Sequence, residues 1–196
     1  EQALAATLKA IELNPDHADA YMNLGGILQD QGNLEQALAA TLKAIELNPD
    51  HANSYLNLGS IFKTKGDLCA AIASYGKAIE FNKNHTLAKA SLMYCEASIC
   101  DWSSHKQSSE WLEKLGIEGT AVDPWALLAL EDEPERHLIR AQRYYEERYA
   151  RVELKIYPSS KSKIRIGYFS ADFRTHPVMQ LIARIIELHD HTYFEV

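Results

Sequence analysis

The spacing of hydrophobic and polar residues changes near residue 100. Up to about residue 99, a pattern of paired helices returns every 34 residues, and beyond that point the repeat stops. Three further helices are predicted there: one through Trp111 that ends at Gly116, a short one that Asp123-Pro124 opens and that runs through Leu130, and one that begins at Pro134. Hydrophobic residues lie along one side of the third helix and predict the face that packs, namely Leu138, Ile139, Ala141, Tyr145 and Tyr149.

Strand and helix signals alternate in the last part of the chain. Residues 164–170 predict a strand, and His176-Pro177 opens a helix that runs to about Leu188. The apolar face of this helix is wide, as expected for a helix that covers a parallel sheet. A second strand begins near Tyr193. The pattern therefore predicts the opening βαβ unit of a doubly wound domain.

The repeat is visible in the residues themselves. Residues 1–18 are identical to residues 35–52, and a third, diverged copy begins at Cys69. Gly32 and Gly66 follow the first helix of a pair and can adopt the left-handed conformation that ends it. Asn33 and Asp67 come next and are predicted to cap the second helix.

Several residues at fixed places in this period resemble the tetratricopeptide repeat (TPR). They are Tyr21-x-x-Leu24-Gly25 and Tyr55-x-x-Leu58-Gly59 in the first helix, and Ala37, Ala44 and Pro49 in and after the second. Gly25 and Gly59 are expected to let paired helices approach closely, with Ala37 and Ala71 as small partners. Residues 1–17 correspond to a lone second helix, so the solenoid is expected to continue upstream. The helix at about 86–99, where Met93 replaces the glycine, is expected to close the array.

A TPR array presents a concave groove lined by the first helix of each pair. Asn23 and Asn57 occupy the same repeat position there, and Ser91 takes the third place. Carboxamides donate and accept hydrogen bonds and so suit a peptide backbone. Asparagine is also a common solvated residue at this position, and both interpretations remain open.

Charge and cysteine content narrow the possible partners. The net charge is −7 without a dense basic cluster, which argues against nucleic acid, and no apolar run is long enough for a bilayer. Three cysteines without a CxxC pair predict free thiols in a reducing compartment, hence a cytoplasmic protein without a metal site. His17, His51 and His85 recur with the period and are interpreted as loop residues between repeats rather than as metal ligands.

One segment of the sequence indicates a particular protein family more specifically than the repeats do. Residues 163–177, Lys-Ile-Arg-Ile-Gly-Tyr-Phe-Ser-Ala-Asp-Phe-Arg-Thr-His-Pro, resemble the start of the catalytic region of O-linked N-acetylglucosamine transferases, including the Spindly type. Cys100-Asp101-Trp102 is similar to the junction that follows the TPRs in this family, and Phe194-Glu195-Val196 to its next strand.

The resemblance implies an inverting transferase with two Rossmann-like lobes, of the GT-B type. It would move a sugar from UDP-N-acetylglucosamine, or a related UDP-sugar, to Ser or Thr of proteins held by the TPRs. His176 matches the family's active-site histidine, as a base or as a hydrogen-bonding partner of the substrate. Gln180 stands where many relatives have a second histidine. Because the donor pocket belongs mostly to the second lobe, this chain alone is expected to be inactive and to bind no cofactor.

The expected fold class is mainly α, a TPR solenoid and linker helices followed by the first βα unit of a Rossmann-like domain. The expected divisions are a solenoid at 1–99, a helical linker at 100–158 and the start of a catalytic domain at 159–196. The alternative function is a TPR scaffold for protein–protein interaction without catalytic activity.

Overall fold

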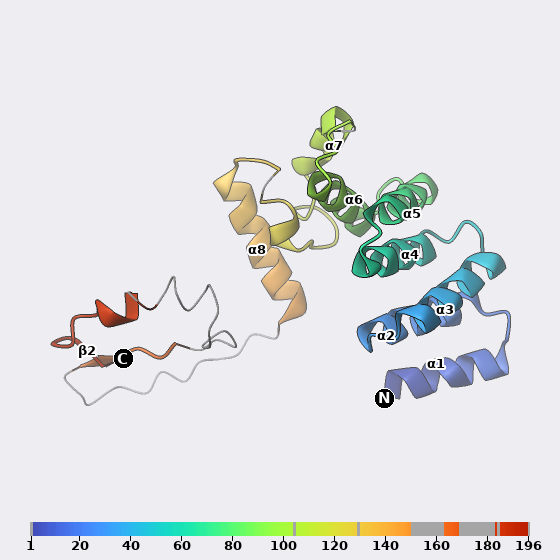
Figure 1. Ribbon diagram of the computed structural model, residues 1–196, viewed down its shortest axis with the longest axis horizontal. Helices are drawn as coiled ribbons and strands as arrows, with labels where there is room; N and C mark the ends of the chain where they lie inside the picture. The colour runs from blue at the N-terminus through green and yellow to red at the C-terminus, as the bar shows by residue number, and fades with distance from the viewer. Residues whose placement is uncertain are drawn as a thin grey trace. The chain divides into compact units, whose positions relative to one another are not determined.

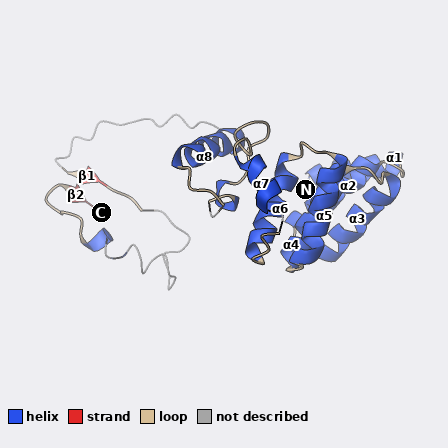
Figure 2. Cartoon of the chain, turned by 90° about the horizontal axis from the view of Figure 1, so that it is seen from above, coloured by secondary structure: helices blue, strands red, loops and turns tan. Residues whose placement is uncertain are grey.

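A computed structural model describes residues 2–103, 105–128, 130–149, 163–168, 183 and 185–195. The chain separates into two compact units, Glu1–Arg151 and Val152–Val196. The first unit is helical, and the second contains a short parallel strand pair (Figures 1 and 2).

The bounds of the helices in the first unit are α1 (Gln2–Leu13), α2 (Ala18–Asp30), α3 (Leu34–Leu47), α4 (Ala52–Lys65), α5 (Leu68–Phe81), α6 (Thr86–Ser98), α7 (His105–Leu112), η1 (Pro124–Ala126) and α8 (Pro134–Arg148). The repeats of this unit form antiparallel helix hairpins, α2 with α3 and α4 with α5 (Figure 1). The most extensive packing lies within the hairpins α2–α3 and α4–α5, and a looser contact between α3 and α4 joins them. This arrangement confirms the predicted TPR-like solenoid.

Glycines end the first helix of each hairpin as predicted. Gly32 and Gly66 have φ angles of +79° and +84°, in the left-handed region. The Asp67 carboxylate accepts a hydrogen bond of 3.0 Å from the backbone nitrogen of Ala70, which caps α5. Asn33 occupies the same place before α3, but its side chain makes no cap hydrogen bond. The predicted cap is therefore present in one hairpin and missing in the other.

The paired helices approach closely where the first helix lacks a Cβ atom. A Cβ atom added to Gly59 would lie 2.6 Å from the ring of Tyr75, and one added to Gly25 would lie 2.3 Å from the hydroxyl of Thr41. Thr41 and Tyr75 occupy the same repeat position. The close approach confirms the prediction for the two glycines, although it is these larger side chains that fill the space. Ala37 and Ala71 are fully buried beside them.

Burial depends on neighbouring helices rather than on local sequence, as α1 and α3 show. Their sequences are identical from Gln2 to Leu13 and from Gln36 to Leu47. The second copy packs against both α2 and α4 and buries Ala37, Ala40, Thr41 and Ala44. The first copy packs against α2 alone in the described part of the chain and buries none of its residues.

The third hairpin does not continue the pattern. Met93 stands where the earlier first helices have glycine, and it is buried with Ala90 in a cluster beyond the repeats. The rest of that cluster comes from α7, η1 and the loop between them: Leu112, Leu115, Val122 and Leu127. We call residues 101–149, as far as they are described, the cap. Because a methionine fills the place of a glycine, α6 packs against the cap instead of opening a new hairpin.

Helix α8 packs through charged residues, which corrects the sequence-based prediction. Leu138, Tyr145 and Tyr149, predicted to pack, are more than half exposed. Ala141 is exposed and Ile139 is largely so. Arg140 is instead fully buried, and its guanidinium donates to the carbonyl oxygens of Leu112 and Leu115 and pairs with Glu131.

Residues in the next two turns of α8 also bind the backbone of the loop that follows α7. Arg143 donates to the carbonyl oxygens of Ile117 and Gly119, and the Glu147 carboxylate accepts from the backbone nitrogen of Ala121. Hydrophobic periodicity treats arginine as a solvent-facing residue, so it predicted that the face of α8 opposite to Arg140 and Arg143 would pack. The reason is that these loop carbonyls need donors, which arginine supplies and leucine cannot.

The second unit contains two short parallel strands, β1 (Ile164–Arg165) and β2 (Phe194–Glu195), with Ile164 opposite Phe194. The predicted strand at 164–170 is shorter over its described residues, since Ile166 to Tyr168 are not strand. Parallel pairing across an intervening helical segment is what a βαβ unit requires. Residues 185–187 are helical, whereas the predicted helix start at His176 lies outside the described residues.

A matched pair of glycine substitutions tests the close approach within the hairpins. Gly59→Ala is expected to lower the free energy of unfolding by about 1–3 kcal/mol, because the new methyl group meets the buried Tyr75 ring. Gly76→Ala is the control, in the middle of α5 with open space around its Cβ position, and should raise it by about 0.5–1 kcal/mol. Urea unfolding followed by circular dichroism measures both. Equal effects of the two substitutions would contradict the packing described.

A second substitution tests the charged packing of α8. Arg140→Met should lower the free energy of unfolding by about 3–5 kcal/mol, because the buried Glu131 carboxylate keeps only its pair with Arg136, at 3.0 Å, and the carbonyl oxygens of Leu112 and Leu115 lose their donor. Adding Glu131→Gln should restore part of the loss, since the half-paired carboxylate is removed while Arg136 keeps Glu133. Tryptophan fluorescence during urea unfolding is the measurement, because Trp111 and Trp125 lie in the cap. A loss below about 1 kcal/mol for Arg140→Met would contradict the assignment.

Candidate functional site

The predicted groove residues lie on neighbouring first helices. Asn23 is exposed on α2, and Asn57 is half-buried at the equivalent position of α4. The Asn57 side-chain nitrogen donates a hydrogen bond of 3.0 Å to the carbonyl oxygen of Met22, which precedes Asn23. A Cβ atom added to Gly26 would lie at an ordinary van der Waals distance of 3.7 Å from the same nitrogen, so the contact does not depend on this glycine. The Asn57 carboxamide thus contacts the backbone of α2 at the residue before Asn23, and each of the two carboxamides has an oxygen able to accept a hydrogen bond.

Further polar side chains continue along this surface. The Gln29 carboxamide donates to the hydroxyls of Ser60, at 2.8 Å, and Thr64, at 3.2 Å, which connects α2 to α4. The buried Tyr75 ring of α5 packs with Leu92 of α6, and its phenol lies near the side chains of Ser60 on α4 and Ser91 on α6. Burial raises the pKa of the Tyr75 phenol, so it remains a neutral donor at physiological pH. We call this surface, with Asn23, Gln29, Asn57, Ser60, Thr64 and Ser91, the first-helix face.

Two of the three periodic histidines, His51 and His85, contact the preceding repeat. The His51 ring lies 3.2 Å from the Asp19 carboxylate and 2.8 Å from the Ser54 hydroxyl. The Nε2 atom of His85 lies 3.0 Å from the side-chain oxygen of Asn53. Asn53 occupies the repeat position of Asp19. Burial lowers the pKa of His85. Their role is to join successive first helices at their N-termini, and within the described part of the chain no cluster of His, Cys, Asp or Glu is arranged to hold a metal.

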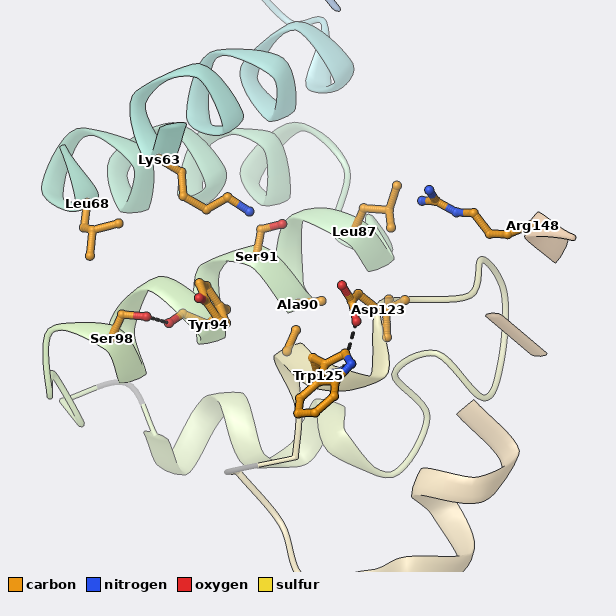
Figure 3. Close-up of a pocket in the computed structure, with 12 residues that line it drawn as sticks. Lys63, Leu68, Leu87, Ala90, Ser91, Tyr94, Ser98, Asp123, Trp125 and Arg148 are labelled. Carbon is orange, nitrogen blue, oxygen red and sulfur yellow. Dashed lines mark hydrogen bonds between the residues drawn. The ribbon is translucent and has the colours of Figure 1, made fainter. Parts of the chain in front are cut away.

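A hollow of about 620 Å³ lies where the first-helix face meets the cap (Figure 3). Its floor is apolar, from Leu68, Leu87, Ala90, Val122 and Ala126. Lys63 of α4 and Arg148 of α8 extend toward it from opposite sides, while Tyr94 of α6 and Trp125 of η1 lie below them in the view of Figure 3. Ser91 occupies in α6 the repeat position that Asn23 and Asn57 occupy in α2 and α4, and it also lines the hollow.

The charge of this hollow is mainly positive. The Lys63 amino group lies 5.6 Å from the ring centroid of Tyr94, and its charge also opposes the burial that raises the pKa of the Cys95 thiol. The Arg148 guanidinium lies 4.9 Å from the ring of Tyr144. The Asp123 carboxylate accepts from the backbone nitrogen of Trp125 at 3.0 Å and so serves as the cap of η1. Two cations therefore face an apolar hollow whose one carboxylate is already hydrogen-bonded.

Sequence reasoning found Asn23 and Asn57 but missed this hollow. Lys63, Tyr94, Trp125 and Arg148 come from four separate elements and follow no common period. The signal that was present is Asp123-Pro124, which predicts a helix start and thereby fixes the position of Trp125. The other predicted site residue, His176, lies outside the described residues, as does Gln180. No helix among the described residues is long and apolar enough to cross a membrane.

Comparisons with known proteins support the repeats and the fold. Tetratricopeptide repeat models match residues 18–51 and 52–85. Among solved structures, YrrB, described as a TPR protein with an unusual peptide-binding site, is 24% identical with a TM-score of 0.55, over 74% of this chain and 76% of that one. MamA is 22% identical with a TM-score of 0.51, over 74% of this chain and 88% of the other.

A mutant of the Thermobaculum terrenum O-GlcNAc transferase is 24% identical with a TM-score of 0.48. That alignment covers 98% of this chain, which spans 32% of the transferase chain. No match is found among curated proteins. Residues 18–85 are therefore two tandem tetratricopeptide repeats, and the chain has the fold of TPR proteins.

Proposed function

We propose that this chain is a protein-interaction module whose first-helix face binds an extended polypeptide. The observation that carries the proposal is the contact of Asn57 with α2 beside Asn23, which places two carboxamides on adjacent repeats. Carboxamides and hydroxyls can satisfy both the N–H and the C=O groups of a bound backbone without selecting side chains. Specificity must then come from another part of the surface.

Substitution of the two carboxamides tests this proposal. A peptide selected from a random display library is expected to bind Asn23→Ala/Asn57→Ala about tenfold or more weakly, because each lost hydrogen bond contributes about 0.5–1.5 kcal/mol. Asn33→Ala is the matched control, in the exposed turn between α2 and α3, and should leave the dissociation constant unchanged. Fluorescence anisotropy measures binding. Equal affinity of the double variant and the parent would refute the proposal.

The second candidate function is that of a glycosyltransferase that uses the repeats to hold its acceptor. Its support is the resemblance of residues 163–177 to the O-GlcNAc transferase family, together with the parallel pairing of β1 and β2. In this proposal the donor is UDP-N-acetylglucosamine or a related UDP-sugar, and the acceptors are Ser or Thr side chains. His176 would act as a base or bind the substrate. A cytoplasmic location fits the three free cysteines.

Sugar transfer by the full-length protein distinguishes the enzyme from a scaffold without catalytic activity. With radiolabelled UDP-N-acetylglucosamine and a lysate as acceptor, His176→Ala should lower the rate by about 10² or more if His176 is a general base. His189→Ala is the control, since the His189 ring bonds the Tyr168 hydroxyl at 2.7 Å, and it should keep most of the activity. The 196-residue chain alone is expected to transfer no sugar. No transfer by the full-length parent would favour the scaffold.

A further inference from the structure

The hollow beside Ser91 continues the first-helix face into a different chemical surface. Along α2 and α4 this face carries carboxamides and hydroxyls, whereas at α6 it reaches two cations and two exposed aromatic rings. Trp125 is 78% exposed and Tyr94 is 44% exposed. The change takes place where Met93 ends the repeat and joins α6 to the cap.

The exposed tryptophan is held by a specific local structure. Asp123 caps η1 and Pro124 occupies its first turn, so the backbone of Trp125 is fixed at the edge of the hollow. Leu127, two residues later, is completely buried in the core of the cap. A rigid backbone that displays a large indole ring at an apolar hollow offers contact area at low conformational entropy cost.

The charge indicates which partner fits. Lys63 and Arg148 bring two positive charges to a chain whose net charge is −7. Each cationic group lies over an aromatic ring, the Lys63 amino group over Tyr94 and the Arg148 guanidinium over Tyr144, and these cation–π contacts help to position the two charges. Carboxylates of a ligand would meet complementary charge here, while an apolar side chain between them would contact the floor and Trp125.

We propose that this hollow binds an acidic segment of a polypeptide, with carboxylates of Asp or Glu directed to Lys63 and Arg148 and an apolar or aromatic side chain between them on Trp125. The assignment rests on the proposed function, because the same polypeptide lies along Asn23 and Asn57 and enters the hollow past Ser91. The carboxamides hold the backbone, and the hollow selects the sequence.

Three synthetic peptides of equal length test the assignment: Gly-Ser repeats that carry Glu-Leu-Phe-Glu, Gln-Leu-Phe-Gln or Lys-Leu-Phe-Lys. The acidic peptide should bind about tenfold more tightly than the glutamine peptide at low salt, and the lysine peptide should bind most weakly. The preference should shrink as salt is added, because the Debye length falls from about 10 Å at 0.1 M to about 3 Å at 1 M. Anisotropy titration gives each dissociation constant.

Substitutions in the hollow test which residues produce the preference for the acidic peptide. Lys63→Gln and Arg148→Gln should each reduce the acidic preference about threefold to tenfold while the glutamine peptide binds as before. Trp125→Ala should weaken the acidic and the glutamine peptides alike. Lys77→Gln is the matched control, because its amino group lies 6.0 Å from the Phe81 ring, outside the hollow, and it should change nothing.

The possible failures are distinguishable. If Asn23→Ala/Asn57→Ala weakens binding of the glutamine peptide but acidic and glutamine peptides bind equally, the hollow is wrongly assigned and the proposed function stands. If the double variant binds the glutamine peptide as the parent does, the proposed function itself fails. A phosphoserine peptide that binds more than tenfold more tightly than the glutamate peptide would overturn the choice of carboxylates.

Discussion

The arrangement of the repeats depends on the absence of a Cβ atom at one position in the first helices α2 and α4. At Gly59 the ring of Tyr75 occupies the space that any side chain would need, and at Gly25 Thr41 does so. This close approach lets Tyr75 of a second helix reach Ser60 and Ser91 on two consecutive first helices. The spacing of the first-helix face is therefore set by packing within the hairpin. Thr41 is shorter, and its buried hydroxyl has no hydrogen-bond partner within the described structure.

The same position also determines where the repeat ends. Met93 has a side chain where the earlier helices have none, so α6 contributes to the core of the cap. The cap is then attached to α8 by buried arginine donors rather than by an apolar stripe, which leaves Leu138, Tyr145 and Tyr149 exposed. Closing the solenoid in this way creates the cationic hollow, because the lining of the hollow comes from α4 and α6 together with η1 and α8 of the cap.

The sequence predicts what is periodic and local. A 34-residue repeat, glycines after the first helices and a proline at the start of η1 and α8 determine most helix bounds of the first unit. The position of Asn57 next to α2 follows from the same period. The packed face of α8 could not be predicted in this way, because the burial of Arg140 depends on carbonyl groups in a loop 25 residues or more earlier. The hollow could not be predicted either, since its cations and rings share neither a helix nor a period.

The central claim is that the first-helix face binds a polypeptide, and amide chemical-shift mapping tests it most directly. Titration of the ¹⁵N-labelled chain with the Glu-Leu-Phe-Glu peptide should perturb amides of α2, α4 and α6, together with the indole of Trp125. The second helices α3 and α5 should be affected much less, because they form the opposite side of each hairpin. Perturbations centred on α3 and α5, or none up to millimolar peptide, would contradict the account.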